Sequence, residues 1–260
     1  MDLNLKHKKI IITGGTQGIG GAISRILAEE GAIPIFIGRK KETGEALVEE
    51  LREKGQESFF IQADLSEKGS CKMIVEKVLQ EFKEIHALVN NAGINDNIGL
   101  EKGSPEKFQI SLLSNLQHYY DMAHYCLPAL KESKGNILNI SSKVALSGQG
   151  GTSGYAAAKG AQTALTREWA AELLPYKIRV NAILPAEVAT PQYKSWLESF
   201  DNPKEKKLHI ENRIPFEHRM TTPEEIAWTA AFLLSDKSSH TTGQLIVPDG
   251  GYLHLDRSLT

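Results

Sequence analysis

Three side chains in the middle of the sequence could move a proton during a hydride transfer. Tyr155 and Lys159 are four residues apart in GYAAAKG, and Ser142 lies upstream of both. A free phenol has a pKa of about 10, so a tyrosine acts as a base at neutral pH only when a nearby positive charge stabilises the phenolate. Because residues i and i+4 share one face of a helix, this spacing places the Lys159 ammonium beside the phenol. The Ser142 hydroxyl, at the end of a neighbouring strand, would orient the substrate oxygen.

A glycine-rich segment far ahead of these residues could bind a dinucleotide. TGGTQGIG (13–20) closes a predicted strand and opens a predicted helix. Glycines at this junction permit a tight turn and a close approach of the backbone to a pyrophosphate, which the helix N-terminus faces. The same glycines would also suit a plain strand-to-helix turn, so the motif depends on the residues that accompany it.

The end of the second predicted strand bears on the choice of cofactor. In many dinucleotide-binding folds an acidic residue about 20 residues beyond the glycines binds the adenine-ribose hydroxyls. Here that place reads Gly38-Arg39-Lys40-Lys41. Nothing in it repels a 2′-phosphate, and the planar guanidinium of Arg39 suits one, which favours NADP over NAD. The alternatives are a solvated basic cluster at a helix start and stacking on adenine, which selects neither cofactor.

Further polar positions could complete this site. Asp64-Leu65 follows the third strand, where the carboxylate could accept a hydrogen bond from the adenine amino group or cap a helix over 66–83. Asn90-Asn91-Ala92-Gly93 ends the fourth strand with small residues that pass near the cofactor, or forms a simple Asn-rich turn. Asn115 lies inside an otherwise leucine-rich helix, a position that argues against mere solvation.

Short apolar runs alternate along the chain with longer segments of helical periodicity. The runs predict seven strands, at 9–13, 33–37, 58–62, 87–91, 136–140, 178–184 and 244–247. The helical segments are 18–30, 41–54, 66–83, 104–131, 153–174 and 223–235. This alternation predicts an α/β fold, a Rossmann-type doubly wound parallel seven-stranded sheet with helices on both faces. Ser104-Pro105 and Thr222-Pro223 each place a cap residue before a proline at a helix start.

The length of 260 residues suits a single dinucleotide-binding and catalytic domain over 1–260, and 41% hydrophobic residues suffice for an extensive core. The stretch 186–222 breaks the alternation of strands and helices. It is rich in proline, charge and aromatic residues and is too long for an ordinary loop of a compact α/β unit. We therefore expect it to form a lid over the substrate.

Charge and cysteine content narrow the range of partners. A formal charge of −2, from 30 basic and 32 acidic residues, gives no reason to expect a nucleic acid or an anionic membrane. Cys71 and Cys126 lack metal-ligand spacing, so we expect two reduced, buried thiols and no metal site. The N-terminus lacks the apolar core of a signal peptide, and no stretch approaches the roughly 18 apolar residues that span a membrane. We expect a cytoplasmic protein that acts on a small molecule.

Taken together, these segments resemble the short-chain dehydrogenase/reductase family along essentially the whole chain. The matching segments, in family order and spacing, are TGGTQGIG, Asp64, NNAG (90–93), Asn115, ISS (140–142), YAAAK (155–159), RVNAILP (179–185) and PDGG (248–251). The resemblance implies that Tyr155 is the acid/base and that Ser142 holds the substrate oxygen. It implies that Lys159 contacts the nicotinamide ribose and lowers the pKa of the tyrosine, and that Asn115 anchors a proton-relay water. It also implies a homotetramer that pairs long helices.

The same resemblance assigns the cofactor contacts. They lie in the glycine turn, at the strand ends, on the catalytic helix and at the start of the lid: Gly14, Thr16, Gln17, Gly18, Ile19, Gly20, Arg39, Lys40, Asp64, Leu65, Asn91, Ala92, Gly93, Tyr155, Lys159, Pro185, Val188 and Thr190. The chain departs from the family at Pro185-Ala186, where Pro-Gly is usual. Alanine restricts the backbone there, which leaves the course of the lid open.

Within the family, the sequence is similar to bacterial L-fucose dehydrogenases, which oxidise the anomeric hydroxyl of a 6-deoxy sugar to a lactone. The similar stretches are GINDNIGL (93–100), HYYDMAHYC (118–126), LPAEVATPQY (184–193), SSHTTG (238–243) and DGGYLHLDRSL (249–259). Beside Ser142 and Tyr155, the side chains of Asn95, Gln149 and Glu187 would supply the hydrogen-bonding partners that a sugar needs. Taken one by one, each of those three would be a solvent-facing loop residue.

The remaining side chains near the expected site allow two interpretations each. Lys143 could contact a sugar hydroxyl or repel bound cations, although we expect an exposed loop lysine. Tyr193, Trp196 and Phe200 could stack on a sugar face or pack the lid onto the domain.

The sequence thus predicts oxidation of a sugar hydroxyl, L-fucose or a related aldose, with NADP or NAD. The alternatives are a 3-oxoacyl-thioester or other ketone reductase of the same family and a non-catalytic NADP-sensing regulatory protein. A protein of the last kind would tend to lose the Tyr155–Lys159 pair, which this chain retains.

Overall fold

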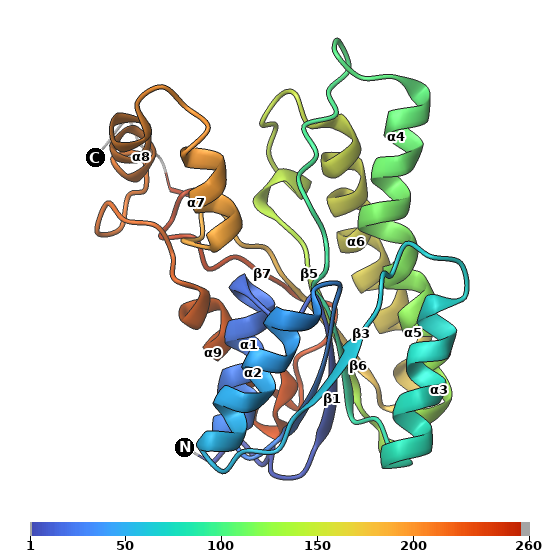
Figure 1. Cartoon of the computed structure of the whole chain (residues 1–260). Coiled ribbons are helices and arrows are strands. Elements are labelled where there is room, and N and C mark those ends of the chain that lie inside the picture. The colour runs from blue at the N-terminus through green and yellow to red at the C-terminus, as the bar shows by residue number, and fades with distance from the viewer. Residues whose placement is uncertain (1, 256–260) are drawn as a thin grey trace.

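The computed structural model describes residues 2–255, and in this range seven parallel strands form one sheet with helices on both faces (Figure 1). The stretch 249–259, which is similar to L-fucose dehydrogenases, extends beyond this range, so its residues 256–259 lie outside the described residues. The strands are β1 Lys9–Thr13, β2 Ile33–Gly38, β3 Phe59–Gln62, β4 Ala87–Asn90, β5 Asn136–Ile140, β6 Arg179–Ile183 and β7 Leu245–Ile246. Their order is β3-β2-β1-β4-β5-β6-β7. The order reverses between β1 and β4, and at such a switch point the carboxyl ends of the strands leave a crevice for a ligand.

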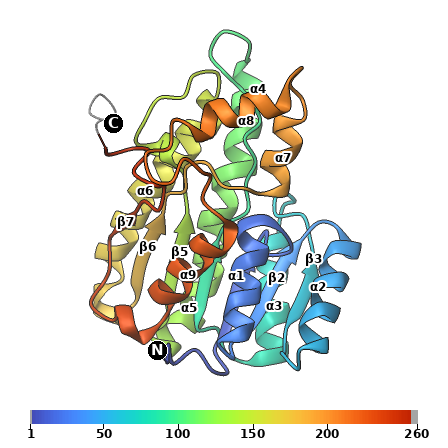
Figure 2. The same cartoon turned by 90° about the vertical axis from the view of Figure 1, so that its left-hand side faces the viewer.

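Nine α-helices lie within the described residues. They are α1 Gly18–Glu29, α2 Lys41–Glu53, α3 Ser70–Phe82, α4 Pro105–Leu112, α5 His118–Ser133, α6 Ser153–Glu172, α7 Pro191–Leu197, α8 Pro203–Glu211 and α9 Pro223–Leu234. Figure 2 shows α1 and α9 side by side across one face of the sheet. Helices α3, α5 and α6 cover the opposite face, where they pack with the strands in a second core.

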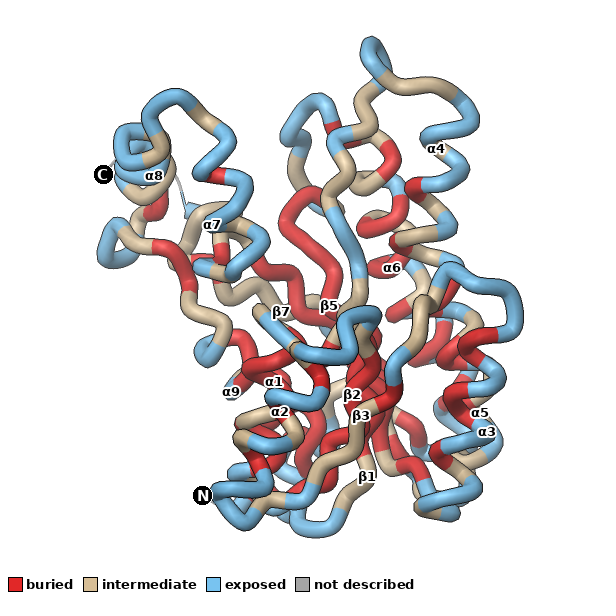
Figure 3. The backbone as a smooth tube through the Cα atoms, in the orientation of Figure 1, coloured by how far each residue is buried: buried red, intermediate tan, exposed pale blue. Residues whose placement is uncertain are grey.

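The central strands are apolar on both faces, as a sheet covered on both sides requires. In β1, Ile10 and Ile12 belong to the core under α1 and α9, whereas Ile11 belongs to the core under α3, α5 and α6. All three side chains are at most 1% exposed. Figure 3 shows the same pattern as a buried centre through the sheet with exposed residues on the outer faces of the helices. The sheet therefore provides a rigid floor for the loops at its carboxyl edge.

Two predicted helices differ from the observed ones. The segment predicted as one helix over 104–131 consists of α4 and α5 joined by a π-helical turn at Leu113–Gln117. Helix α3 starts at Ser70 rather than at 66, because Gly69 adopts a left-handed backbone with φ of 84° immediately before it. The helix starts at Ser104 and Thr222 are confirmed, since each side chain accepts a hydrogen bond from the backbone N–H three residues on.

The 186–222 segment leaves the sheet after β6 and carries α7 and α8. Its two ends meet in a β-bridge between Val188 and Thr221. Leu197, Ile214 and Met220 form a small core of their own within it, against which Tyr193 and Tyr252 pack.

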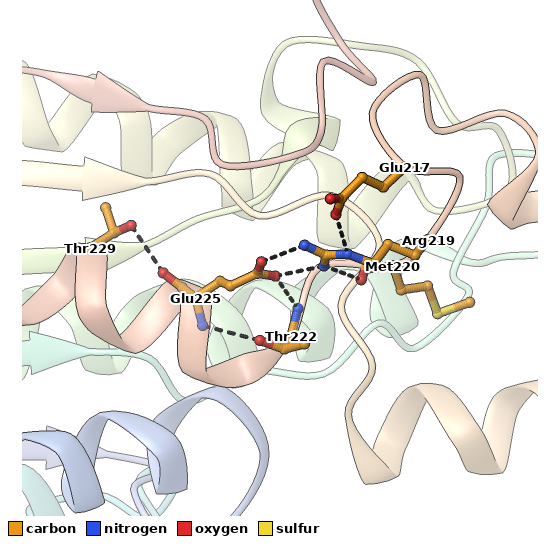
Figure 4. Close-up of polar contacts among 6 residues, drawn as sticks. All are labelled: Glu217, Arg219, Met220, Thr222, Glu225 and Thr229. Carbon is orange, nitrogen blue, oxygen red and sulfur yellow. Dashed lines mark hydrogen bonds and ion pairs between the residues drawn. The ribbon is translucent and has the colours of Figure 1, made fainter.

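A charged network joins the end of this segment to α9 (Figure 4). The Arg219 guanidinium donates to the carboxylates of Glu217 and Glu225, and Glu225 forms a capping box with Thr222. The C-terminal end of the segment is therefore anchored to α9.

Both cysteines, Cys71 and Cys126, are buried free thiols, as predicted. Among residues 2–255, no helix has the length and apolar content needed to cross a membrane.

Candidate active site

Helix α6 places Tyr155 and Lys159 on one face, as the four-residue spacing predicts. The Lys159 ammonium lies 5.5 Å from the centroid of the Tyr155 ring. Lys159 is 3% exposed, whereas Tyr155 is intermediate and so reaches the surface of the site. Ser142 follows β5 in an extended conformation, and its hydroxyl hydrogen-bonds with that of Tyr155. The structure thus brings the three predicted residues together.

The ionisation of the pair differs from the expected one. Burial raises the pKa of Tyr155 from 10.0 to about 12, against which the Ser142 hydrogen bond acts in the lowering direction. Burial also lowers the pKa of Lys159 from 10.5 to about 7. The expectation that the pKa of Tyr155 is lowered is therefore not met by the protein alone, because desolvation of the phenol outweighs the hydrogen bond from Ser142. A positive charge beside the phenol would act in the opposite direction and lower this pKa.

Three acceptors surround the Lys159 ammonium. It donates hydrogen bonds to the Ile140 carbonyl at 2.8 Å, to Gln162 Oε1 at 3.1 Å and to the Tyr119 hydroxyl at 3.4 Å. Tyr119 in turn donates to the Ile140 carbonyl at 2.9 Å. Sequence reasoning missed Gln162 and Tyr119. The available signal was a glutamine one turn after Lys159, on the same face of the helix.

The π-helical turn places Asn115 in the interior, where it is fully buried. Its Oδ1 accepts from the Ile94 N–H at 2.7 Å, and its Nδ2 donates to the Ser111 carbonyl at 3.0 Å. Its main-chain carbonyl accepts from Gln162 Nε2 at 2.7 Å. The interior position of Asn115 agrees with the prediction, and its role with a relay water stays a prediction.

The glycine turn has the geometry that a pyrophosphate requires. Gly14 and Gly18 have φ of 62° and 56°, values that L side chains rarely adopt. A Cβ at Gly20 would collide with the Gly14 carbonyl, so only glycine fits there. No side chain caps the N-terminus of α1, so its first backbone N–H groups are left for a ligand, and Gln17, Ile19 and Thr16 lie around them. These features fit a dinucleotide.

The loop after β4 is tied to this turn by hydrogen bonds. Asn91 Nδ2 donates to the carbonyls of Thr13 and Gly14 at 2.9 and 3.1 Å. Thr13 Oγ1 accepts from the backbone N–H groups of Asn91 and Ala92 at 2.8 and 3.1 Å. Gly93 leaves no room for a side chain, since a Cβ would lie 2.9 Å from Asn115 Oδ1. Asn91 therefore holds the loop after β4 against the glycine turn. Sequence reasoning missed Thr13, which is buried.

The residues predicted to select the cofactor lie at the ends of β2 and β3. Arg39 and Lys40 are exposed just beyond β2. Asp64 Oδ1 accepts from the backbone N–H and the hydroxyl of Ser66, which lowers the pKa of Asp64, and the charge of Arg39 adds to this effect. Asp64 thus holds a short turn, and its interpretation as the cap of a helix over 66–83 is wrong because α3 begins at Ser70. Leu65, next to it, is partly buried.

Lys143 differs from the exposed loop lysine that we expected. It is only 8% exposed and forms an ion pair with Glu187. Its ammonium also lies 4.1 Å from the centroid of the Tyr252 ring. The prediction was wrong because its partner, Glu187, is distant in sequence, and a buried charge is tolerated when it is paired. Glu187 also contributes to raising the pKa of Tyr193, after the larger effect of burial.

The other predicted substrate contacts are less enclosed. Asn95 Oδ1 accepts from the Asn97 N–H at 3.3 Å in a local turn, and Gln149 lies exposed in the loop before α6. Sequence reasoning missed Asp96, whose buried Oδ1 has no hydrogen-bond partner and whose charge contributes to raising the pKa of Tyr155. Asp96 is therefore a carboxylate close to the proposed reacting group.

The start of the 186–222 segment runs beside the glycine turn. The Pro185 carbonyl accepts from the Lys143 N–H at 2.9 Å, and Thr190 caps α7 with its side chain at Gly18. Ala186 is not among the residues with a left-handed backbone, so alanine causes no strain in place of the usual glycine. Val188 is held in the β-bridge described above.

The aromatic side chains of this segment pack on one another. The rings of Tyr193 and Trp196 are 5.1 Å apart between centroids, and those of Trp196 and Phe200 are 4.9 Å apart. Both pairs are edge-on. These contacts lie within the segment itself, so packing onto the domain and stacking on a sugar both stay predictions for the three aromatics.

The family model described as "Enoyl-(Acyl carrier protein) reductase" matches residues 14–253, nearly the whole chain. With the seven-stranded sheet and the Tyr155–Lys159 pair, this match shows that the chain belongs to the short-chain dehydrogenase/reductase family of oxidoreductases. It is 38% identical to the 3-oxoacyl-(acyl-carrier-protein) reductase FabG of Chlamydia pneumoniae, over 96% of this chain and 99% of that protein. It is 34% identical to the L-fucose dehydrogenase of Mus musculus, over 96% of this chain and 90% of that protein. The crystal structure of Cj0485 dehydrogenase is 49% identical, with a TM-score of 0.95 over 100% of this chain and 99% of that one.

Proposed function

We propose that this enzyme oxidises the anomeric hydroxyl of L-fucose or a related aldose, with NADP as the preferred cofactor. The observation that carries the proposal is the set of charged side chains beside the Tyr155–Ser142 pair. Lys143 directly follows Ser142 in the sequence and is paired with Glu187. Asp96 lies near Tyr155. A sugar offers many hydroxyls to such groups, whereas an acyl chain requires apolar walls.

The proton moves through residues of this chain. The Tyr155 phenolate takes the proton of the substrate hydroxyl while Ser142 donates a hydrogen bond to the same oxygen. When bound, the oxidised nicotinamide supplies the hydride acceptor and a positive charge next to the phenol. That charge acts in the direction needed to bring the pKa of Tyr155 down from about 12. Lys159 adds to it as long as it stays protonated.

The choice of NADP rests on the end of β2. Arg39 is exposed there and no acidic residue takes the usual place after the strand. An arginine fork pairs well with a phosphate, whereas a carboxylate would repel it. Members of this family use NAD or NADP, and this position favours the phosphorylated cofactor.

Further parts of the proposal concern the molecule as a whole. We infer that residues 1–260 act as a single domain in which 186–222 covers the bound sugar. We also infer a cytoplasmic homotetramer without nucleic-acid or membrane partners. Its assembly is supported by apolar side chains that are exposed on α4, the π-helical turn, α5 and α9, namely Ile110, Leu113, Tyr120, Trp228 and Phe232.

A second candidate function is the reduction of 3-oxoacyl thioesters. It is favoured by the 38% identity to the Chlamydia pneumoniae FabG, which exceeds the identity to the mouse L-fucose dehydrogenase. Both reactions would use the Tyr155–Lys159 pair, with Tyr155 taking the proton of the sugar hydroxyl in the first and donating a proton to the ketone oxygen in the second. They differ in the polarity that the substrate pocket must have.

Absorbance of the reduced nicotinamide distinguishes these functions. A panel of aldoses, including L-fucose, D-arabinose and D-glucose, is assayed with NADP and with NAD, beside a 3-oxoacyl thioester assayed with NADPH. We expect the highest kcat/KM for an aldose with NADP. Turnover of the thioester with no turnover of any aldose would replace the proposal with the second candidate.

A further inference from the structure

Gln162 is a buried residue that links two parts of the site. It lies one turn after Lys159 on α6 and is fully buried. Its Oε1 accepts a hydrogen bond from Lys159 Nζ at 3.1 Å, and its Nε2 donates to the Asn115 carbonyl at 2.7 Å. Each end of this amide therefore contacts a different element, the catalytic helix and the π-helical turn.

The orientation of Gln162 is fixed by these two contacts. Gln162 Oε1 can only accept a hydrogen bond, so it must face the ammonium. Its Nε2 group can only donate, so it must face the Asn115 carbonyl. Asn115 is itself held by Ile94 and Ser111 at its side chain. The Gln162 amide is thus anchored on a rigid turn. It presents its acceptor to Lys159 from a defined direction.

Lys159 depends on acceptors of this kind because it is buried and no carboxylate within residues 2–255 pairs with it. All three of its hydrogen-bond acceptors are neutral oxygens, those of Ile140, Gln162 and Tyr119. Hydrogen bonds to an ion favour its charged form, whereas burial disfavours it. An ammonium has three N–H donors, so losing one of these acceptors leaves a buried donor without a partner.

We propose that Gln162 is a positioning residue that keeps the Lys159 ammonium charged and beside Tyr155 by bridging it to the Asn115 carbonyl. The inference rests on the proposed role of Tyr155 and Lys159 in proton transfer. It extends that role to a residue which contacts neither the substrate oxygen nor Tyr155. Through this bridge, the shape of the π-helical turn would determine where the positive charge of the site lies.

Two substitutions of similar length test the proposal in opposite directions. Gln162→Met removes both hydrogen bonds, so the ammonium is less favoured. Gln162→Glu keeps an acceptor and adds negative charge, so the ammonium is more favoured. Tyr155 and Lys159 titrate as a coupled pair. In the oxidation direction, the fall of kcat at low pH, the acid limb of the pH profile, therefore reports on the protonation of both groups. We expect this limb to move to lower pH in Gln162→Met and to higher pH in Gln162→Glu. The plateau of Gln162→Met should fall on the order of tenfold, as for the loss of one hydrogen bond to an ion.

Thr166→Val is the matched control. Thr166 is one turn further along α6, is fully buried, and donates to the main-chain carbonyl of Gln162 without contacting Lys159. This variant should lower the melting temperature and leave the acid limb in place.

The titration of Lys159 can also be measured without substrate. Nuclear magnetic resonance of ¹³C-labelled lysine follows its side chain, and the signal is assigned with Lys159→Met. We expect the Lys159 titration to move down in Gln162→Met and up in Gln162→Glu. If both variants only lose thermal stability while Lys159 titrates as in the wild type, Gln162 is a packing residue and the inference fails. Absence of aldose oxidation by the wild type would instead refute the proposed function, and this titration would still decide the role of Gln162.

Discussion

Two buried lysines near Tyr155 have different surroundings, which gives them different effects on it. Lys143 is paired with the Glu187 carboxylate, so its charge is largely cancelled. Within the described residues, Lys159 donates only to neutral oxygens, so no carboxylate cancels its charge when it is protonated. An unpaired buried charge is costly and is typical of a functional group. This difference in surroundings favours the proposed role of Lys159 beside the Tyr155 phenol and a structural or binding role for Lys143.

Replacing Tyr155 by phenylalanine tests the proposed base. Tyr155→Phe keeps the ring but removes the group that takes the substrate proton, so kcat should fall by about 10²–10⁴-fold, as for the loss of a general base. Affinity for NADP, measured by fluorescence titration, should change little because the glycine turn is untouched. Turnover at the wild-type rate would exclude Tyr155 as the base. A wild-type protein that binds NADP but turns over no substrate would instead favour the non-catalytic, NADP-sensing alternative.

A double-mutant cycle tests the Lys143–Glu187 pair. Their side chains are 10% and 14% exposed, and removing one partner of a buried pair costs about 3–5 kcal/mol because the other charge is left alone. We expect Lys143→Met and Glu187→Leu each to lower the free energy of unfolding by about 3 kcal/mol in urea titrations. The double variant should lose much less than the sum. Additive losses would show that the two groups do not interact.

At the residue scale, the sequence predicts contacts that depend on local spacing. The positions of Tyr155 and Lys159 follow from the helical repeat, and Ser142 follows from the end of a strand. Lys143 and Gln162 could not be assigned in this way. Their partners, Glu187 and Asn115, lie 44 and 47 residues away. Only the packing of the 186–222 segment and of the π-helical turn brings these groups together.

The Thr222 side chain stabilises the start of α9 through a capping box with Glu225. Thr222 accepts from the Glu225 N–H at 3.2 Å, and Glu225 Oε2 accepts from the Thr222 N–H at 2.8 Å (Figure 4). Thr222→Ala should lower the free energy of unfolding by about 1 kcal/mol, the usual effect of losing an N-cap. Thr229→Ala, further along the same helix, is the control. It replaces a half-buried mid-helix threonine, whose hydroxyl bonds only back to the Glu225 carbonyl, with a better helix former, so it should be neutral or slightly stabilising. Equal losses in both variants, measured by chemical unfolding, would contradict the capping role.

At the element scale, strand and helix patterns predict most of the fold. All seven strands occur where the apolar runs lie, because a sheet buried on both faces needs such runs. The π-helical turn at Leu113–Gln117 was not predicted, since one extra residue in a turn hardly alters the periodicity of a long helix. Helices α7 and α8 were not predicted either. They are short, and their apolar residues pack in a small separate core rather than on the sheet.

On the scale of the whole molecule, His118 should make stability depend on pH. Burial lowers its pKa from 6.5 to about 4, and in the described part of the chain its Nδ1 has no hydrogen-bond partner. Because the unfolded chain binds a proton at higher pH than the native state, the contribution of His118 is complete above pH 6.5 and is lost as the pH falls towards 4. The full difference corresponds to roughly 3 kcal/mol.

We expect His118→Gln to flatten this part of the stability curve, since the amide can still donate to the Ser114 carbonyl, which His118 Nε2 contacts at 3.1 Å. Unfolding in urea between pH 4 and pH 7 provides the measurement. His209→Gln, an exposed position on α8, serves as the control and should follow the wild type. A curve that is equally steep in His118→Gln would show that other groups cause the dependence.

The β-bridge between Val188 and Thr221 has a consequence for how substrate range can change. Val188 and Thr221 hold the two ends of this segment against each other, so the entropic cost of closing the loop between them grows only slowly with its length. Insertions, deletions or exchanges between the two anchors would leave the strands and the proton-transfer groups undisturbed. Relatives with the same chemistry could therefore acquire new specificities by replacing this one stretch as an exchangeable module.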